Sequence, residues 1–193
     1  MVGSQWRSTH HLRVWYSTAM DVLAASKDIN LDKYKNALLY FIANANNKYL
    51  GSTKLNKLMY YLDFVSYRDR DMSVSGDIYL HLDFGPVPQE IDKVLATLKR
   101  EGVVSATDVP FKDDHKDEFK TTTDPDMKVF DKYEAELLDA IAKEFELWDT
   151  AKIVEQTHLE APWFYSEPLA VVDYDYANDI DFFAGLSYAS AGS

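Results

Sequence analysis

Residues 54–102 read KLNKLMYYLDFVSYRDRDMSVSGDIYLHLDFGPVPQEIDKVLATLKREG and carry the strongest structural signals in the chain. At about 100° per residue, the first part of this stretch places apolar or aromatic side chains on nearly every side of a helix. One face carries Leu55, Leu58, Met59, Leu62 and Val65, and Tyr60, Phe64 and Tyr67 lie roughly opposite. A helix that is apolar almost all round is buried among other elements, so we expect this helix to be the centre of the fold.

A narrow polar strip interrupts this helix and contains Lys57, Tyr61 and Arg68, with Lys54 three residues before the first of them. Cations on a buried helix of an acidic chain have two explanations. They pair with acidic side chains inside the fold, or they contact acidic groups of a partner. The sequence leaves both explanations open, and these four residues are candidates for partner binding.

The apolar run at 78–84 leads directly into Gly85-Pro86-Val87-Pro88. Glycine permits backbone conformations that other residues resist, and proline fixes φ and disfavours helix in the residue before it. We therefore predict a short strand and then a turn at Gly85 and Pro86 with a structural role. A helix is expected to begin at Pro88 and to bury Ile91, Val94, Leu95 and Leu98.

Helical periodicity predicts further helices at about 10–25, 32–47, 129–147 and 149–156. Asn30 or Asp32 suits the N-cap of the helix at 32–47, and Ser52 or Thr53 suits the N-cap of the central helix. The helix at 10–25 is expected to pack on the domain or to face a partner.

A last helical turn is predicted after residue 157. Thr157 and Glu160 have the spacing of a capping box, and Pro162 limits the turn that this box opens. The aromatic residues that follow, at 163–165, are expected to fold back onto the core.

Two short strands are predicted at 103–109 and 118–122, around the polar loop 112–117. Helix, short strand, helix and hairpin in this order are typical of a winged helix. The loop is acidic and would make a poor DNA wing, so the likeness concerns architecture alone. The fold class predicted is α+β, predominantly helical, with a short strand before the Gly-Pro-Val-Pro turn and a small β-hairpin.

Three segments in this order resemble the Panacea domain of SocA-like antitoxins, a family also found as phage-associated proteins. They are KLNKLMYY at 54–61, FGPV at 84–87 and THLEAPW at 157–163, and the resemblance covers about residues 32–165. One position departs from the pattern, because many members carry a Trp where this chain has Leu82. The motif residues expected to be structural are Gly85, Pro86, Val87, Pro88, Thr157, His158, Pro162 and Trp163.

The resemblance implies a helical, cytoplasmic domain whose gene lies beside a toxin gene. Members of the family neutralise unrelated toxins, many of them inhibitors of translation, by direct contact, and SocA itself delivers its toxin to a ClpXP-type protease. We therefore expect an antitoxin whose partners are a cognate protein toxin and, in the delivery route, such a protease. The alternative is a winged-helix-like DNA-binding transcriptional regulator.

The composition limits the function classes. The 193 residues contain no cysteine, 47% are hydrophobic, and 32 acidic against 20 basic residues give a formal charge of −12. This balance opposes binding that neutralises nucleic-acid phosphates and favours a basic protein partner. No apolar run is long enough to span a membrane. We expect residues 1–30 to form a helical extension, 31–166 the main domain, and 167–193 an acidic and aromatic C-terminal segment.

Catalytic motifs are sparse. There is no glycine-rich phosphate loop, no His-Glu-x-x-His helix and no Gly-x-Ser-x-Gly elbow. His10 and His11 would diverge on a helix, His115 lies among charged residues, and His158 is either a general base or a partly buried structural side chain. We predict no cofactor, no metal and no enzymatic activity.

The C-terminal segment alternates acids with aromatic residues. Its acids are Asp173, Asp175, Asp179 and Asp181, and Tyr174, Tyr176, Phe182 and Phe183 lie between or beside them. Either the aromatic rings pack on the domain while the acids stay solvated, or the segment enters a cationic groove of a toxin by imitating a nucleic acid. Asp175, Asp179, Asp181 and Phe182 are therefore further candidates for toxin binding.

Overall fold

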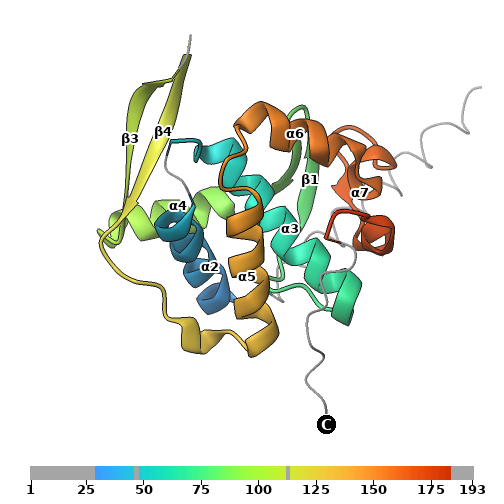
Figure 1. The fold of residues 1–193 in the computed structure, drawn as a ribbon, viewed down its shortest axis with the longest axis horizontal. Coiled ribbons are helices and arrows are strands. Elements are labelled where there is room, and N and C mark those ends of the chain that lie inside the picture. The colour runs from blue at the N-terminus through green and yellow to red at the C-terminus, as the bar shows by residue number, and fades with distance from the viewer. Residues whose placement is uncertain (1–28, 46–47, 112–113, 184–193) are drawn as a thin grey trace, which may run out of the picture.

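The computed structural model describes residues 29–45, 48–111 and 114–183, so the helix predicted at 10–25 and both His10 and His11 lie outside the described residues. Figure 1 shows helices packed around a long central helix, with small strands at two places. In chain order the elements are α2 (Leu31–Asn44), α3 (Ser52–Arg70), β1 (Tyr79–Leu82), β2 (Gly85–Pro88), α4 (Ile91–Arg100), β3 (Val104–Phe111), β4 (Asp114–Thr121), η1 (Met127–Val129), α5 (Lys132–Glu144), α6 (Thr150–Leu159), α7 (Ala161–Phe164), β5 (Val171–Val172) and η2 (Tyr174–Asp179).

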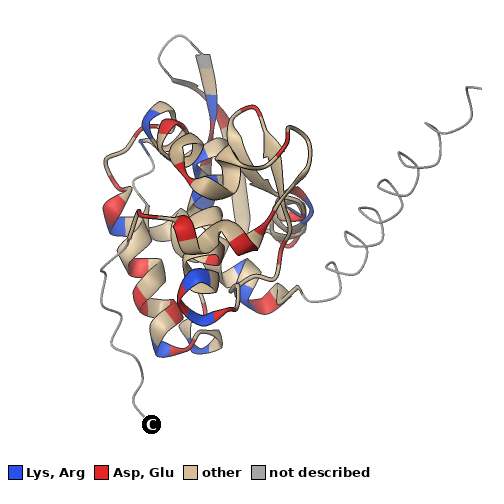
Figure 2. Cartoon of the chain, turned by 90° about the vertical axis from the view of Figure 1, so that its right-hand side faces the viewer, with Lys and Arg blue, Asp and Glu red and all other residues tan. Residues whose placement is uncertain are grey.

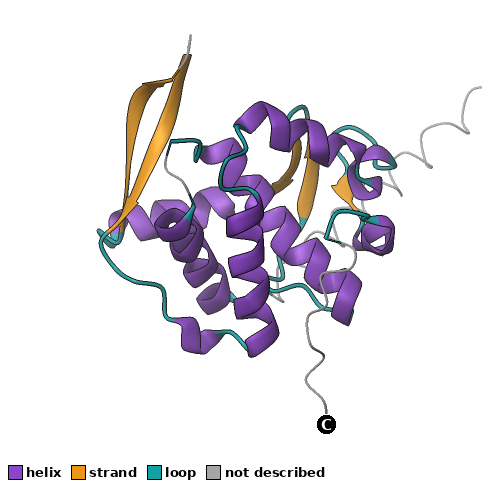
Figure 3. Ribbon diagram, viewed as in Figure 1, coloured by secondary structure: helices purple, strands orange, loops and turns teal. Residues whose placement is uncertain are grey.

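The strands form two separate antiparallel sheets among the described residues. β2 and β5 flank β1 in the first sheet, with Tyr79 opposite Pro88 on one side and opposite Val172 on the other. The hairpin of β3 and β4 forms the second sheet and projects from the body in both Figure 1 and Figure 2. Helices make up most of the rest (Figure 3), so the fold is α+β and predominantly helical, as the sequence predicts.

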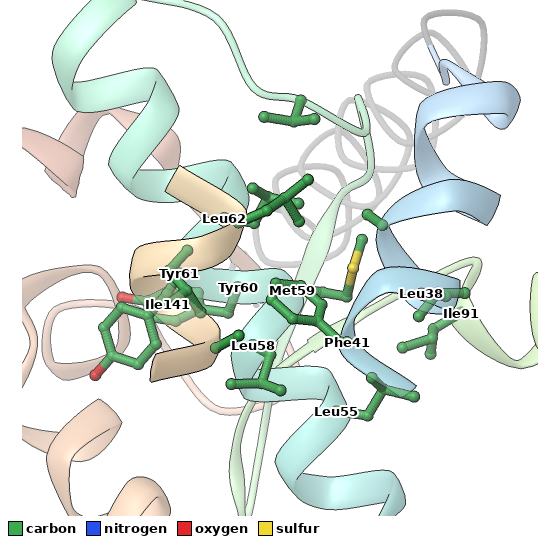
Figure 4. Close-up of a cluster of buried hydrophobic side chains, with 14 of the residues drawn as sticks. Leu38, Phe41, Leu55, Leu58, Met59, Tyr60, Tyr61, Leu62, Ile91 and Ile141 are labelled. Carbon is green, nitrogen blue, oxygen red and sulfur yellow. The ribbon is translucent and has the colours of Figure 1, made fainter. Parts of the chain in front are cut away.

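The central-helix prediction is confirmed. Leu58 and Leu62 in α3 are fully buried, and the helix contacts α2, α5, α6, β2 and η2. Figure 4 shows Leu38 and Phe41 of α2, Ile91 of α4 and Ile141 of α5 meeting the side chains of α3. One helix thus supplies the middle of the core, and the elements around it each bury one face.

Local capping agrees with the sequence at some helix ends and differs at others. The Asn30 side chain accepts a hydrogen bond from the backbone N–H of Lys33, as an N-cap does. Gly51, rather than Ser52 or Thr53, is the N-cap of α3. Ser52 is the first residue of the helix, and its hydroxyl donates to the Asp117 carboxylate.

The Gly-Pro-Val-Pro segment is a strand, which corrects the predicted turn. Asp83 and Phe84 make the turn, and Gly85 to Pro88 return along β1 as strand β2. The predicted helix start at Pro88 is also wrong, since Glu90 is the N-cap of α4 and Ile91 its first residue. Proline suits this edge strand because it has no N–H to donate to a further strand.

Candidate functional site

The strip predicted to be polar is instead buried, and this corrects the expected contact role of Lys54, Lys57 and Tyr61. All three side chains are 0% exposed. In the described residues their polar atoms contact the fold itself, so in this structure they form no partner-facing surface. Neither lysine forms an ion pair with an acid of the described residues, and both ammonium groups bond to backbone carbonyl oxygens instead.

The Lys54 side chain caps the C-terminal end of α5. Its Nζ donates to the carbonyl oxygens of Phe145, at 2.6 Å, and Trp148, at 2.7 Å. The last carbonyls of a helix have no partner within that helix and carry partial negative charge, which a cation offsets. Burial lowers the pKa of Lys54 to about 8. This lysine therefore joins the start of α3 to the end of α5.

Lys57 is the point at which the three sequence motifs meet. Its Nζ donates to the Pro86 carbonyl oxygen at 2.8 Å, and burial lowers the pKa of Lys57 to about 7. A Cβ on Gly85 would lie 2.8 Å from Lys57 Cε and 2.7 Å from Thr157 Oγ1, and Gly85 has a φ of +93°. Only glycine fits at this position, so Gly85 allows the first, second and third motifs to pack together.

Thr157 does not open a capping box, which corrects the prediction for this segment. It lies in the last turn of α6, is fully buried, and its hydroxyl donates to the Val154 carbonyl oxygen. Glu160 is the N-cap of α7 but makes no side-chain cap; it accepts hydrogen bonds from Gln156, at 2.9 Å, and from the Tyr61 hydroxyl, at 3.5 Å. The reciprocal box occurs instead between Asp131 and Glu134 at the start of α5.

Three stacked rings connect α7 with α6 and β1: Trp163 of α7, His158 of α6 and His81 of β1. Trp163 lies between His158, with a centroid distance of 3.9 Å, and His81, at 4.2 Å. Burial lowers the pKa of His158, and the nearby charges of Lys57 and His81 lower it further. Its Nε2 atom is buried and has no hydrogen-bond partner among the described residues. The stacking on Trp163 places His158 among the packed side chains that hold α7.

The C-terminal segment returns onto the core, as the packing interpretation predicts. Tyr174 stacks on Phe64 at 4.2 Å, and its hydroxyl donates to the Asp77 carbonyl oxygen. Phe182 and Phe183 pack against Tyr61, with centroid distances of 5.7 Å in both cases. Phe182 is thus half-buried rather than free for a partner, whereas Asp173, Asp175, Asp179 and Asp181 are exposed.

Arg68 ties that segment to α3. Its guanidinium donates to the carbonyl oxygens of Ile180, at 3.2 Å, and Phe182, at 3.1 Å, and pairs with Asp69 at 2.7 Å. The predicted ion pairing within the fold is thus found for Arg68, whose partner is its neighbour in sequence. The candidate residues Arg68 and Phe182 therefore lie together, and both serve to anchor the tail.

The buried acid of α3, Asp63, lies in a hydrogen-bonded cluster with the segment at 74–79. Asp63 accepts from the backbone N–H groups of Val74 and Ser75, from the Ser75 hydroxyl, and from the Tyr79 hydroxyl. Burial raises the pKa of Asp63 to about 6.

No group of three histidines and acids that could hold a metal ion occurs within the described ranges. His115 is exposed in β4 and pairs with Asp108.

A groove lies between the start of α3, the hairpin and α6. It has a volume of about 1010 Å³, and Phe84 and Leu159 are exposed on its wall beside His158.

The predicted return of Phe164 and Tyr165 onto the core is wrong, since these side chains are 65% and 60% exposed. The short helix α7 buries Pro162 and part of Trp163, and its other side faces outward. Sequence spacing gave no sign of this, because α7 is only one turn long.

Comparison with known proteins identifies the family. The family model described as "Antitoxin SocA-like, Panacea domain" matches residues 55–164. The chain belongs to this antitoxin-like family, which indicates a protein as its partner. Neither curated proteins nor solved structures gave a match.

Within residues 29–45, 48–111 and 114–183, no helix is both long and apolar enough to cross a bilayer.

Proposed function

We propose that this chain is the antitoxin of a toxin–antitoxin pair and that it neutralises a cognate toxin in the cytoplasm by direct binding. The toxin is expected to inhibit translation or growth and to be encoded by the adjacent gene. The observation that carries this proposal is the family match over residues 55–164, which includes the second and third motifs and all of the first except Lys54, and these motifs meet at Lys57 and Gly85.

We further propose that the chain acts by binding and has no turnover of its own. Three buried ionisable groups already bond to the fold: Lys57 to the Pro86 carbonyl oxygen, Lys54 to two carbonyl oxygens, and Asp63 to the segment at 74–79. Apolar side chains, in contrast, are exposed on the outside of α7. Such a surface favours contact with another protein.

The test is co-expression of this chain with the product of the adjacent gene under separate inducible promoters. We expect that product alone to stop growth and the chain to restore it, with the two proteins purifying as a complex of fixed stoichiometry. A neighbour that is harmless, or whose toxicity the chain does not relieve, would contradict the antitoxin assignment.

The same assay separates direct neutralisation from delivery to a protease. In a host that lacks ClpXP-type proteases, direct binding predicts full rescue with the toxin still present at its normal level. Loss of rescue in that host, with toxin accumulation, would assign the adaptor route instead. Sequence-specific binding to the promoter of its own operon, without any toxin contact, would favour the DNA-binding alternative.

A further inference from the structure

Exposed apolar side chains concentrate along one edge of the molecule. Six of the nine large hydrophobic residues exposed in the described ranges belong to α7, to the elements next to it, or to the β1–β2 turn: Phe84, Leu159, Phe164, Tyr165, Leu169 and Tyr176. We call this set the α7 face. Figure 1 shows α6, α7 and β1 side by side on the same part of the molecule.

Ring contacts join three residues of the α7 face, and Phe84, Leu159 and Leu169 are placed by other neighbours. The Phe164 and Tyr165 rings lie 5.2 Å apart, and the Tyr165 and Tyr176 rings 5.6 Å apart. Phe84 and Leu159 line the same groove. The backbone N–H of Leu169 donates to the His81 carbonyl oxygen, which fixes this residue beside β1.

The α7 face is held in place before any partner binds. Stacking on His158 and His81 fixes the ring of Trp163, and Trp163 Nε1 donates to the Leu82 carbonyl oxygen at 3.4 Å. Leu169 has a φ of +64° and is 78% exposed. A leucine in this region of φ is strained, and strain that holds an apolar side chain in solvent is typical of a contact site. A rigid surface loses less entropy on binding.

The chain segment that forms most of the α7 face is acidic, and Lys116 is a basic residue on the groove that Phe84 and Leu159 line. From residue 153 to the end of the sequence there is no Lys or Arg, while Glu155, Glu160, Glu167, Asp173, Asp175, Asp179 and Asp181 all fall in this part. Apart from Glu160, these acids are exposed. An apolar surface with an acidic surround is complementary to an apolar surface with a basic surround.

We propose that the α7 face is the toxin-binding surface and that it takes a cationic amphipathic segment of the toxin, with apolar side chains against Phe164, Tyr165 and Tyr176 and Lys or Arg against the surrounding acids. This inference rests on the proposed function. A second copy of the chain fits less well, because two acidic surrounds would repel each other. The acids predicted from the sequence, Asp175 and Asp179, act as the surround, while the apolar anchors lie on α7.

The experiment measures the affinity of full-length variants for the purified product of the adjacent gene, by calorimetry, together with growth rescue. Phe164→Ser and Tyr165→Ser are each expected to weaken binding about 30-fold, as for an aromatic residue central to an interface. Leu31→Ser is the matched control, since Leu31 is 49% exposed on α2, away from α7 in Figure 1. Phe164, Tyr165 and Leu31 are all exposed and tolerate serine, so the three variants should melt like the wild type.

Charge is tested separately. Asp175→Asn with Asp179→Asn should slow association and reduce the salt dependence of Kd, whereas Asp124→Asn, at an exposed acid on the loop after β4, should do neither. Self-association of the wild type that Tyr165→Ser abolishes would assign the α7 face to a second copy and overturn the inference.

The two proposals fail in different ways. Rescue and tight binding by the wild type, with undiminished binding by the combined Phe164→Ser and Tyr165→Ser variant, would overturn the toxin-binding face and leave the antitoxin assignment intact. A wild type that neither binds nor rescues would remove the proposed function and this inference with it.

Discussion

The buried ammonium of Lys57 predicts a pH dependence of stability whose sign is unusual for a lysine. Burial lowers the pKa of this group from 10.5 to about 7 in the folded chain. Between these values the unfolded chain binds a proton that the folded chain has lost, so the free energy of unfolding rises with pH. The destabilising contribution is fully present below pH 7 and is relieved above it.

The magnitude follows from the width of that window. Inside this window the free energy of unfolding rises by about 1.4 kcal/mol for each pH unit. Because the folded group is half protonated at pH 7, the free energy of unfolding rises by about 2 kcal/mol between pH 7 and 9. The pKa of Asp63 is raised only to about 6, and burial raises the pKa of Tyr60 and Tyr79 well above 10, so these three groups contribute little between pH 7 and 9. Burial also lowers the pKa of Lys116, which stays in every variant. Lys54 acts in the same direction and stays in every variant.

The assay is urea unfolding at pH 7, 8 and 9 for the wild type and for Lys57→Met. Methionine keeps the volume of the stem and removes the charge, so the variant should lose about 2 kcal/mol of the pH-dependent gain. Lys128→Met, at an exposed lysine in η1, is the matched control and should keep the wild-type slope. Equal slopes for wild type and Lys57→Met would refute the claim that this ammonium is buried at the junction of the three motifs.

Three further predictions concern the fold. Leu62→Ala should lower the free energy of unfolding by about 2–5 kcal/mol, because a fully buried side chain leaves a cavity; a thermal melt like that of the wild type would contradict the central position of α3. Gly85→Ala should lower the melting temperature more than Gly102→Ala does, since both glycines have positive φ but open space surrounds only Gly102; equal effects would mean that the contacts with Lys57 and Thr157 do not matter. Deletion after Pro168 should destabilise the chain, because β5, Tyr174 and Phe183 pack on the body, and a truncated chain that melts normally would show that the tail is dispensable for folding.

The core and the order of its elements could be predicted from the sequence because both depend on periodicity. Leu58 and Leu62 repeat at helical spacing, and their burial follows from that pattern alone. The hairpin also followed from a polar loop between two β-prone runs, but residues 114–117 of the predicted loop belong to β4, which begins at Asp114. Local signals of this kind remain valid whatever the tertiary packing.

The lysines and the α7 face could not be predicted, because their environments depend on contacts distant in sequence. The carbonyl oxygens that bind Lys54 come from residues more than 90 positions away, and Pro86 reaches Lys57 only because Gly85 lacks a side chain. Phe164 and Tyr165 have the composition of core residues, yet a helix of four residues can bury only one side. Hydrophobicity alone therefore assigned them to the core.

The central claim is that the chain binds its toxin through the α7 face, and hydrogen exchange of the full-length chain with and without the adjacent gene product tests it most directly. We predict that the amides of residues 159–169 and 173–179 gain protection in the complex, while those of α2 and of the β3–β4 hairpin stay unchanged. Protection confined to the hairpin, or to residues 10–25, with the α7 face exchanging as in the free chain, would contradict the account.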